Sequence, residues 1–166
     1  MTLWKTVDRW RYSYFDPDID PQDLPVFSSL LEIWQSKRGG RKVPAWRDFD
    51  FYDFAGWHGK LTVYNISYDP FDYVVRLSGT QVDQLYQRSM KGMTMADMTG
   101  IAVQHVDAVE FYEMACKNLY VTHTVGPLNV RELDYKAVEY IEMPLSDDGV
   151  RATHTMEAAI PIRFDS

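Results

Sequence analysis

The chain of 166 residues is 46% hydrophobic, which is enough apolar material for the core of one domain of ordinary size. Its net charge of −7 opposes nucleic-acid binding, which needs a basic face, and also opposes a polybasic membrane anchor. No apolar run approaches the roughly 18 residues of a membrane span, so we expect no membrane insertion. The single Cys116 and the absence of a signal peptide predict a cytoplasmic protein.

Residues 1–22 are aromatic and charged, and they end in the turn-rich stretch "DPDIDPQD". We predict that they form an N-terminal docking arm ahead of one domain over residues 23–166. Aromatic side chains such as Trp4, Trp10 and Tyr12 are too apolar for a free tail. They pack either on their own domain or on a second subunit, and the second alternative makes a homodimer an expectation.

The domain is predicted to begin with an amphipathic helix. Asp23 is placed as its N-cap, with Pro25 in the first turn and Gly39-Gly40 after the last turn. One side of this helix is apolar over two turns, with Val26, Phe27, Leu30, Leu31, Ile33 and Trp34.

Five strands are predicted from runs of β-branched, aromatic and alternating residues, at 61–68, 73–78, 120–127, 135–145 and 150–162. The turn signals "DPFD" and "SDDG" make hairpins of the first two strands and of the last two. In the last strand His154, Met156 and Ala158 alternate with polar residues, among them Glu157, which predicts a strand buried on one face only.

Helical segments are predicted between the second and third strands. A short helix follows Gly79, and a further turn has Thr94 as a candidate N-cap. The longest helix runs from residue 101 to about 119, with His105 and Tyr112 on its apolar face.

The segment "RLSGTQVDQL", residues 76–85, carries a strand through a glycine into a helix, as phosphate-binding loops do. A Walker-type loop needs several glycines and a Lys-Ser/Thr pair, whereas this segment has a single glycine and no lysine. We therefore exclude a phosphate loop. We expect Gly79 to adopt a backbone conformation that other residues resist, and Thr80 to cap the helix.

The order of these elements, with a long helix between the second and third strands, resembles that of a PAS domain. The resemblance is most specific in "YVVRLSGTQVDQLYQRSMKGMTMADM", residues 73–98, which is similar to a small bacterial PAS subfamily. The hairpin "YIEMPLSDDG" and the lead-in "LLEIWQSKRGGRKVPAWRDFD" are also similar to that subfamily. The resemblance implies an α+β fold: a five-stranded antiparallel sheet with helices on one face, plus a helical N-terminal extension.

In a PAS-like fold the long helix would cross the concave face of the sheet and enclose a small-molecule pocket. The candidate lining residues are His105, Tyr112, His123, His154 and Met156. The alternative for each histidine is a core residue whose ring bonds a backbone carbonyl. His105 is also the candidate if haem were bound, whereas Cys116 lacks the sequence motif of flavin-reactive cysteines. We expect no cofactor by default.

Metal sites and nucleophilic catalysis are not expected. The histidines lack metal-ligand spacing, and Asp50 and Asp53 lack the ligand pattern of a calcium loop. No G-x-S-x-G elbow is present. We therefore predict no catalytic residues.

Two functions remain open from the sequence. The first is a non-enzymatic sensory module that acts in signal transduction through a protein partner, with a small-molecule pocket. The second is a small α+β enzyme of the ketosteroid-isomerase type, which would need a buried base with tyrosine donors opposite. Tyr112 and His105 would supply part of such a site.

Overall fold

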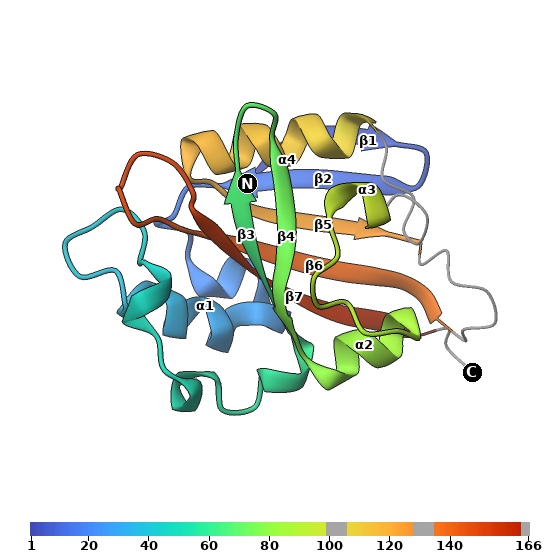
Figure 1. Cartoon of the computed structure of the whole chain (residues 1–166), viewed down its shortest axis with the longest axis horizontal. Helices are drawn as coiled ribbons and strands as arrows, with labels where there is room; N and C mark the ends of the chain where they lie inside the picture. The colour runs from blue at the N-terminus through green and yellow to red at the C-terminus, as the bar shows by residue number, and fades with distance from the viewer. Residues whose placement is uncertain (99–105, 128–134, 164–166) are drawn as a thin grey trace.

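The computed structural model describes residues 1–98, 106–127 and 135–163 (Figure 1). Within these residues the chain forms one antiparallel sheet of seven strands, in the order β1-β2-β5-β6-β7-β3-β4. The strands are β1 (Thr2–Val7), β2 (Trp10–Phe15), β3 (Leu61–Ser67), β4 (Asp72–Ser78), β5 (Val121–Gly126), β6 (Tyr135–Leu145) and β7 (His154–Arg163).

The predicted fold class is therefore wrong. The sheet has seven strands, not the five of the expected PAS-like sheet, and the N-terminal extension begins with a β-hairpin where helices were expected. Residues 1–22 supply the two additional strands, and β2 pairs with β5. The cause is the alternation in "WRYSYF", which turns Tyr12 into the core and fits a pleated strand better than a docking arm. These residues pack on their own domain.

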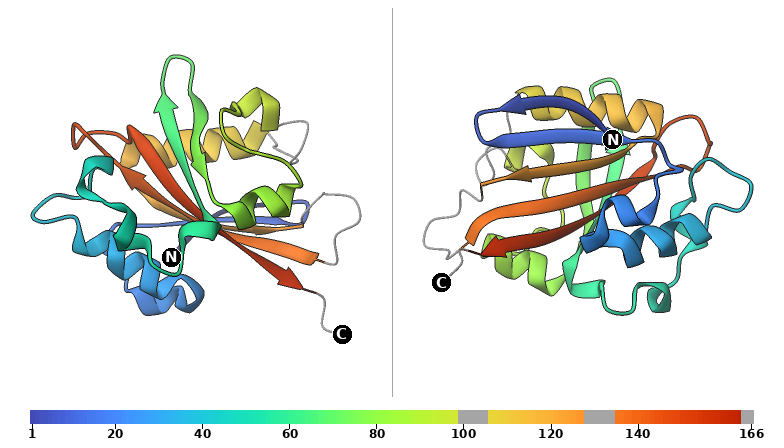
Figure 2. Two further views of the ribbon diagram at one scale, coloured as in Figure 1. Left: turned by 60° about the horizontal axis from the view of Figure 1, so that its bottom comes forward. Right: turned by 180° about the vertical axis from the view of Figure 1, so that it is seen from behind.

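Helices cover both faces of the sheet, not one face as expected. The helix α1 (Ser28–Ser36) lies on one face, and α2 (Thr80–Tyr86), α3 (Met95–Met98) and α4 (Val106–Asn118) lie on the other (Figure 2). The beginning of the predicted long helix, residues 101–105, lies outside the described residues. No helix in the described ranges is long and apolar enough to cross a membrane.

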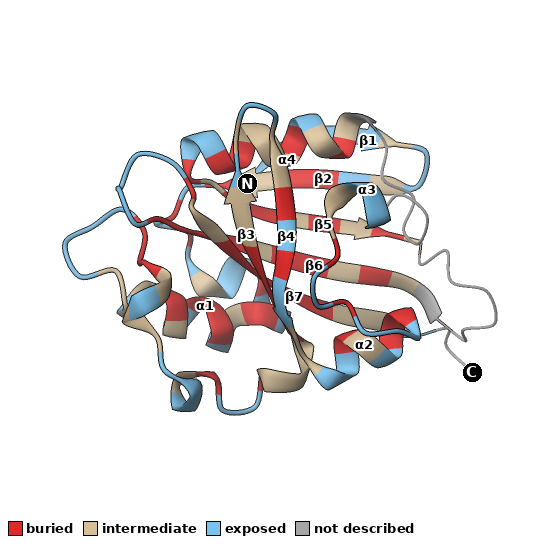
Figure 3. Ribbon diagram, in the orientation of Figure 1, coloured by how far each residue is buried: buried red, intermediate tan, exposed pale blue. Residues whose placement is uncertain are grey.

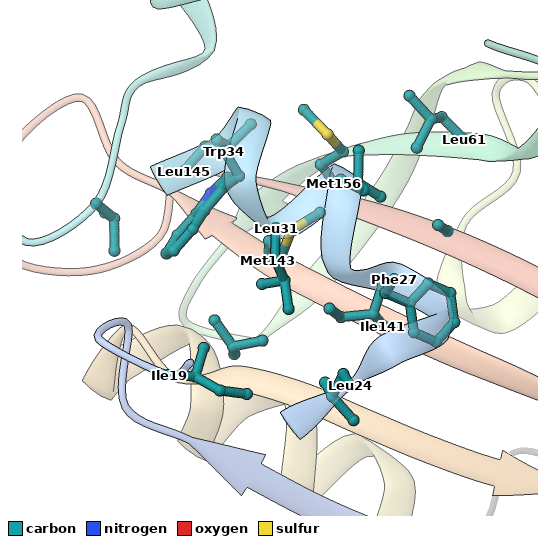
Figure 4. Packing of buried hydrophobic residues seen from close by; sticks show 14 of the residues in the cluster. Ile19, Leu24, Phe27, Leu31, Trp34, Leu61, Ile141, Met143, Leu145 and Met156 are labelled. Carbon is teal, nitrogen blue, oxygen red and sulfur yellow. The ribbon is translucent and has the colours of Figure 1, made fainter. Parts of the chain in front are cut away.

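The main core lies between α1 and the sheet. Phe27, Leu31 and Trp34 pack there against side chains of β6 and β7 (Figure 4). The Trp34 indole also donates a hydrogen bond to the Pro144 carbonyl at 3.1 Å. The apolar stripe predicted for this helix is confirmed except at Val26, which is exposed.

The start of α1 differs from the prediction. The helix begins at Ser28 and is preceded by two 3-10 turns, Pro21–Asp23 and Pro25–Phe27. Asp20, and not Asp23, caps the first of these turns by accepting a hydrogen bond from the Gln22 amide at 2.9 Å. The two prolines each begin a 3-10 turn, because a first-turn position does not need the missing N–H.

The strand β7 is buried on both faces, which corrects the predicted half-buried strand (Figure 3). Met156 and Ala158 pack in the core on the α1 side. Thr155 and Glu157 point to the other face and are also buried, because α2, α3 and α4 cover that face. This second buried face contains the candidate site.

Gly79 ends β4 and occupies the N-cap position of α2, which was predicted for Thr80. Its backbone is extended (φ −74°, ψ 158°), so an unusual conformation is not the reason for a glycine here. A Cβ at this position would overlap backbone atoms of His58 and Gly59. The glycine allows the strand end to approach a neighbouring turn closely.

Candidate functional site

A cavity of about 70 Å³ lies on the face of the sheet that α2, α3 and α4 cover. The hairpin of β3 and β4 crosses the other strands steeply in Figure 1, and this curvature brings β4 close to the helices. Residues of β2, β3, β4, β6, β7 and all three helices therefore line one space. Most of the lining is aromatic, from Trp10, Tyr12, Tyr64, Phe71, Tyr73, Tyr86, Tyr112 and Tyr140; Ile66, Met98 and Ala108 complete its apolar part.

Two glutamates, Glu142 of β6 and Glu157 of β7, line the same cavity. They are direct partners across the antiparallel pair, so their side chains leave the sheet on the same face. Glu157 is only 9% exposed and Glu142 is half-buried. On the neighbouring strands, Thr122 of β5 is the partner of Glu142 and Thr62 of β3 is the partner of Glu157. Both threonines are buried.

Burial makes both carboxyl groups hold their protons more tightly, and the pairing adds to this effect at Glu157. With Cβ atoms about 5 Å apart and an effective dielectric constant near 20, two negative charges would repel by roughly 3 kcal/mol. Burial raises the pKa of Glu142 to about 7, while the Thr155 hydroxyl beside it acts in the opposite direction. Burial, and then the Glu142 charge, raise the pKa of Glu157 well above its ordinary value. The pair therefore retains at least one proton near neutral pH.

Tyrosine hydroxyls surround the pair. Tyr64 donates a hydrogen bond to Oε1 of Glu157 at 3.1 Å. The hydroxyls of Tyr86 and Tyr140 bond each other. The Tyr112 hydroxyl lies 3.3 Å from Oγ1 of Thr124. Burial raises the pKa of all four phenols, so each stays neutral and can donate a hydrogen bond.

The structure places the five predicted pocket residues in different regions. Tyr112, on α4, lines the cavity. Met156 lies in the core on the opposite face, and His154 is the strand partner of Leu145, which belongs to that same core. His123 also lies on the α1 side, against Phe27, with Nε2 at 2.7 Å from Oε1 of Glu139. His105 lies outside the described residues.

Sequence reasoning missed the two glutamates because a charged residue in an alternating strand normally marks the solvent face. The clearest signal was composition: the chain has 11 tyrosines. Buried tyrosine hydroxyls need hydrogen-bond partners, so a chain with many tyrosines is expected to have other polar groups in its interior. Which glutamates provide them follows only from the register that pairs β6 with β7.

Two other features of the structure are less suitable as functional sites. A groove of about 320 Å³ runs between α2 and the end of β7, but its charged residues, Lys60 and Arg163, are half-buried and exposed. No group of three or more histidine, cysteine or acidic side chains could hold a metal ion in the described parts of the chain. The cavity at Glu142 and Glu157 is thus the site in which buried ionisable groups converge.

The comparisons with known proteins do not identify a family. No protein-family model matches the chain, and no curated protein is similar enough to count as a match.

Proposed function

We propose that this protein is a non-enzymatic sensory module, in which a small molecule in the cavity alters the contacts made with a protein partner. The observation that carries the proposal is the cavity itself, a space of about 70 Å³ in which the carboxyl groups of buried Glu157 and half-buried Glu142 meet neutral tyrosine hydroxyls. Few convergent polar groups in a largely apolar space are the usual composition of a small-molecule site.

The resemblance to PAS domains supports the same function. Its most specific segment, residues 73–98, contributes Tyr73, Tyr86 and Met98 to the lining of the cavity. The second similar segment, residues 140–149, contributes Tyr140 and Glu142. The residues that carry the resemblance therefore surround the proposed ligand.

Transmission to a partner requires that ligand binding changes a surface. The short helices α2 and α3 contribute Tyr86 and Met98 to the cavity. They also expose other residues, such as Gln81 and Ala96. If α2 and α3 exchange between two positions, a ligand that contacts them in one position would increase the population of that position. A partner that binds the same position more tightly would then bind more strongly when the ligand is present.

Filling the cavity is the test of this function. Ala108 is buried on α4 and lines the cavity, so Ala108→Leu is expected to abolish binding of cavity ligands from a small-molecule panel, as measured by thermal shift. Ala96→Leu places the same side chain on the exposed surface of α3 and is expected to leave binding unchanged.

Ligands that stabilise the wild type should also slow hydrogen exchange in α2 to α4. If no compound stabilises the wild type, or if Ala108→Leu binds every compound as well as the wild type does, the sensory function is wrong. The absorbance spectrum and the native mass of the purified protein show whether it retains a cofactor or ligand, and whether it is a dimer.

A second function, a small proton-transfer enzyme of the ketosteroid-isomerase type, is favoured by one specific observation. Glu142 and Glu157 have raised pKa values, and a phenol donates to Glu157, so the cavity holds both a candidate base and a hydrogen-bond donor. Deuterium exchange into a small cyclic ketone, catalysed by the wild type and lost in Glu142→Gln, would favour this enzyme over the sensory module.

A homodimer through residues 1–22 remains a prediction. The aromatic residues that suggested it are used within the chain, where Trp4 and Tyr12 each lie 5.2 Å from Phe111, measured between ring centroids. The part of this segment left for a second subunit is the edge strand β1, where Leu3 is exposed.

A further inference from the structure

We infer that the ligand of the cavity is a small organic cation, a protonated amine of a few non-hydrogen atoms held between Glu142 and Glu157 and the surrounding aromatic rings. This inference rests on the proposed function, because it names the ligand class for the same cavity.

The first observation is a pair of acidic side chains with no cationic partner among the side chains that the structure describes. No lysine, arginine or histidine of that set forms an ion pair with Glu142 or Glu157. Buried acidic side chains are normally paired or bound to metal, and no group of metal ligands is present among the same side chains. A cation from outside would replace the proton that the pair retains.

The second observation is the hydrogen-bonding capacity that remains. Oε1 of Glu157 accepts one hydrogen bond, from Tyr64. A carboxylate offers about four lone-pair sites, so the pair can accept further hydrogen bonds from a ligand in the cavity. A protonated amine carries up to three N–H donors on one nitrogen, and its charge strengthens each bond to a carboxylate.

The third observation is the aromatic wall. Rings of Trp10, Tyr73 and Tyr140 line the same space as the two carboxyl groups. The faces of such rings attract cations, most strongly where water is excluded. An anion would be repelled by an ionised carboxylate. A neutral molecule would leave the pair holding its proton.

The size of the cavity limits the ligand. About 70 Å³ is roughly half of the 150 Å³ that an apolar cavity needs to hold benzene. An alkylammonium ion of three or four non-hydrogen atoms therefore suits the enclosed part. Gly126 allows the Trp10 ring, which lines the cavity, to lie against β5, because a Cβ there would overlap that ring.

Ethylammonium is the probe, and methionine methyl resonances report where it binds. Met98 lines the cavity, whereas Met143 and Met156 lie in the core on the opposite face. In a protein with ¹³C-labelled methionine methyls, ethylammonium is expected to shift the Met98 resonance saturably and the other two much less. Ethanol and acetate at the same concentrations should not cause a saturable shift of the Met98 resonance. Three non-hydrogen atoms permit a dissociation constant of about 1 mM at best.

Glutamine variants show whether the carboxyl pair is responsible. Glu142→Gln and Glu157→Gln are each expected to weaken ethylammonium binding at least tenfold. Glu139→Gln makes the same change on β6, at a residue bonded to His123 on the opposite face, and should leave the dissociation constant within a factor of two.

The pH dependence is a second measurement that does not rely on variants. Binding of a cation must displace the proton that the pair retains, so affinity for ethylammonium should fall at least tenfold between pH 8 and pH 5. Ethylamine stays protonated throughout this range, as lysine does. The titratable groups described on the other elements that face the pair are the phenols of Tyr12, Tyr64, Tyr73, Tyr86 and Tyr112, and the thiol of Cys116 beside Glu142. Burial raises the pKa of the Cys116 thiol and of the phenols of Tyr12, Tyr64, Tyr86 and Tyr112, so these groups stay neutral between pH 5 and pH 8.

The outcomes separate this inference from the proposed function. If the wild type and both glutamine variants bind ethylammonium equally well, the inference that the ligand is an organic cation is wrong. Saturable binding of ethanol or acetate, seen at the Met98 resonance, would also contradict that inference, but it would leave a ligand-binding module with a ligand of another class. If no probe shifts the Met98 resonance, the inference is wrong, and the compound panel with Ala108→Leu decides separately whether the cavity binds any ligand.

Discussion

Glu142→Gln is expected to raise the free energy of unfolding at pH 8 by about 3 kcal/mol, although it removes a group proposed to bind the ligand. At that pH the wild-type carboxylate is ionised in a half-buried position, and no described side chain pairs it with a cation. Glutamine has almost the same shape and carries no charge, so the folded state no longer has to bury one.

The sign of the pH dependence follows from the raised pKa. The folded protein holds the Glu142 proton up to about pH 7, whereas the unfolded chain loses it near pH 4.5. Between these values the folded state binds more protons at Glu142, so the contribution of Glu142 to wild-type stability falls as pH rises and levels off above pH 7. The difference between the variant and the wild type should therefore vanish at pH 4.5 and reach its full size by pH 8.

Urea unfolding at several pH values measures this difference. Glu110→Gln is the control, because Glu110 is exposed on α4 and an exposed charge contributes little to stability. If Glu142→Gln is less stable than the wild type at pH 8, or if its gain does not change with pH, then Glu142 is not a buried, uncompensated carboxyl group.

Phe111→Ala is expected to lower the free energy of unfolding by about 3 to 5 kcal/mol, which is the usual cost of removing a buried aromatic ring. Phe111 is 0% exposed on α4, and its ring contacts the rings of Trp4 and Tyr12 at centroid distances of 5.2 Å each. It joins the N-terminal hairpin to the helix that covers the cavity. Hydrogen exchange of β1 amides should increase more than that of β7 amides.

Phe51→Ala is the matched control for this substitution, because Phe51 is 70% exposed. It is expected to change stability by less than about 1 kcal/mol. A cost below 1 kcal/mol for Phe111→Ala would show that residues 1–15 do not depend on α4, and that their place in the sheet needs another explanation.

Local sequence patterns predicted most elements of the described fold. The strand at 135–145 has the predicted bounds, and the helix after Gly79 is present as α2. In both segments the periodicity of apolar residues reflects local backbone preferences and one buried face. Both of these properties can be read from a single sequence. The hairpin over residues 2–15 was missed because its charged residues are threaded between aromatic ones, and only pairing with β5 gives the strands a partner.

The candidate site was predictable only in part. Tyr112 was identified because the apolar stripe of a helix predicts which residues face the sheet. The alternation in β7 predicts one inner face, which places Met156 in the pocket and Glu157 in solvent, whereas this strand has two buried faces. Which of two buried faces holds a cavity depends on tertiary packing, which alternation along one strand does not encode.

An NMR titration of the glutamate side-chain carboxyl carbons, from pH 4 to pH 9, tests whether Glu142 and Glu157 keep a proton until a cation replaces it. Two resonances, assigned by the two glutamine variants, are expected to titrate well above the range of ordinary glutamates, one of them near pH 7. In the presence of ethylammonium both groups are expected to titrate at lower pH. If both groups titrate near pH 4.5, or if ethylammonium does not change their titration, the pair does not hold a proton that a cation replaces.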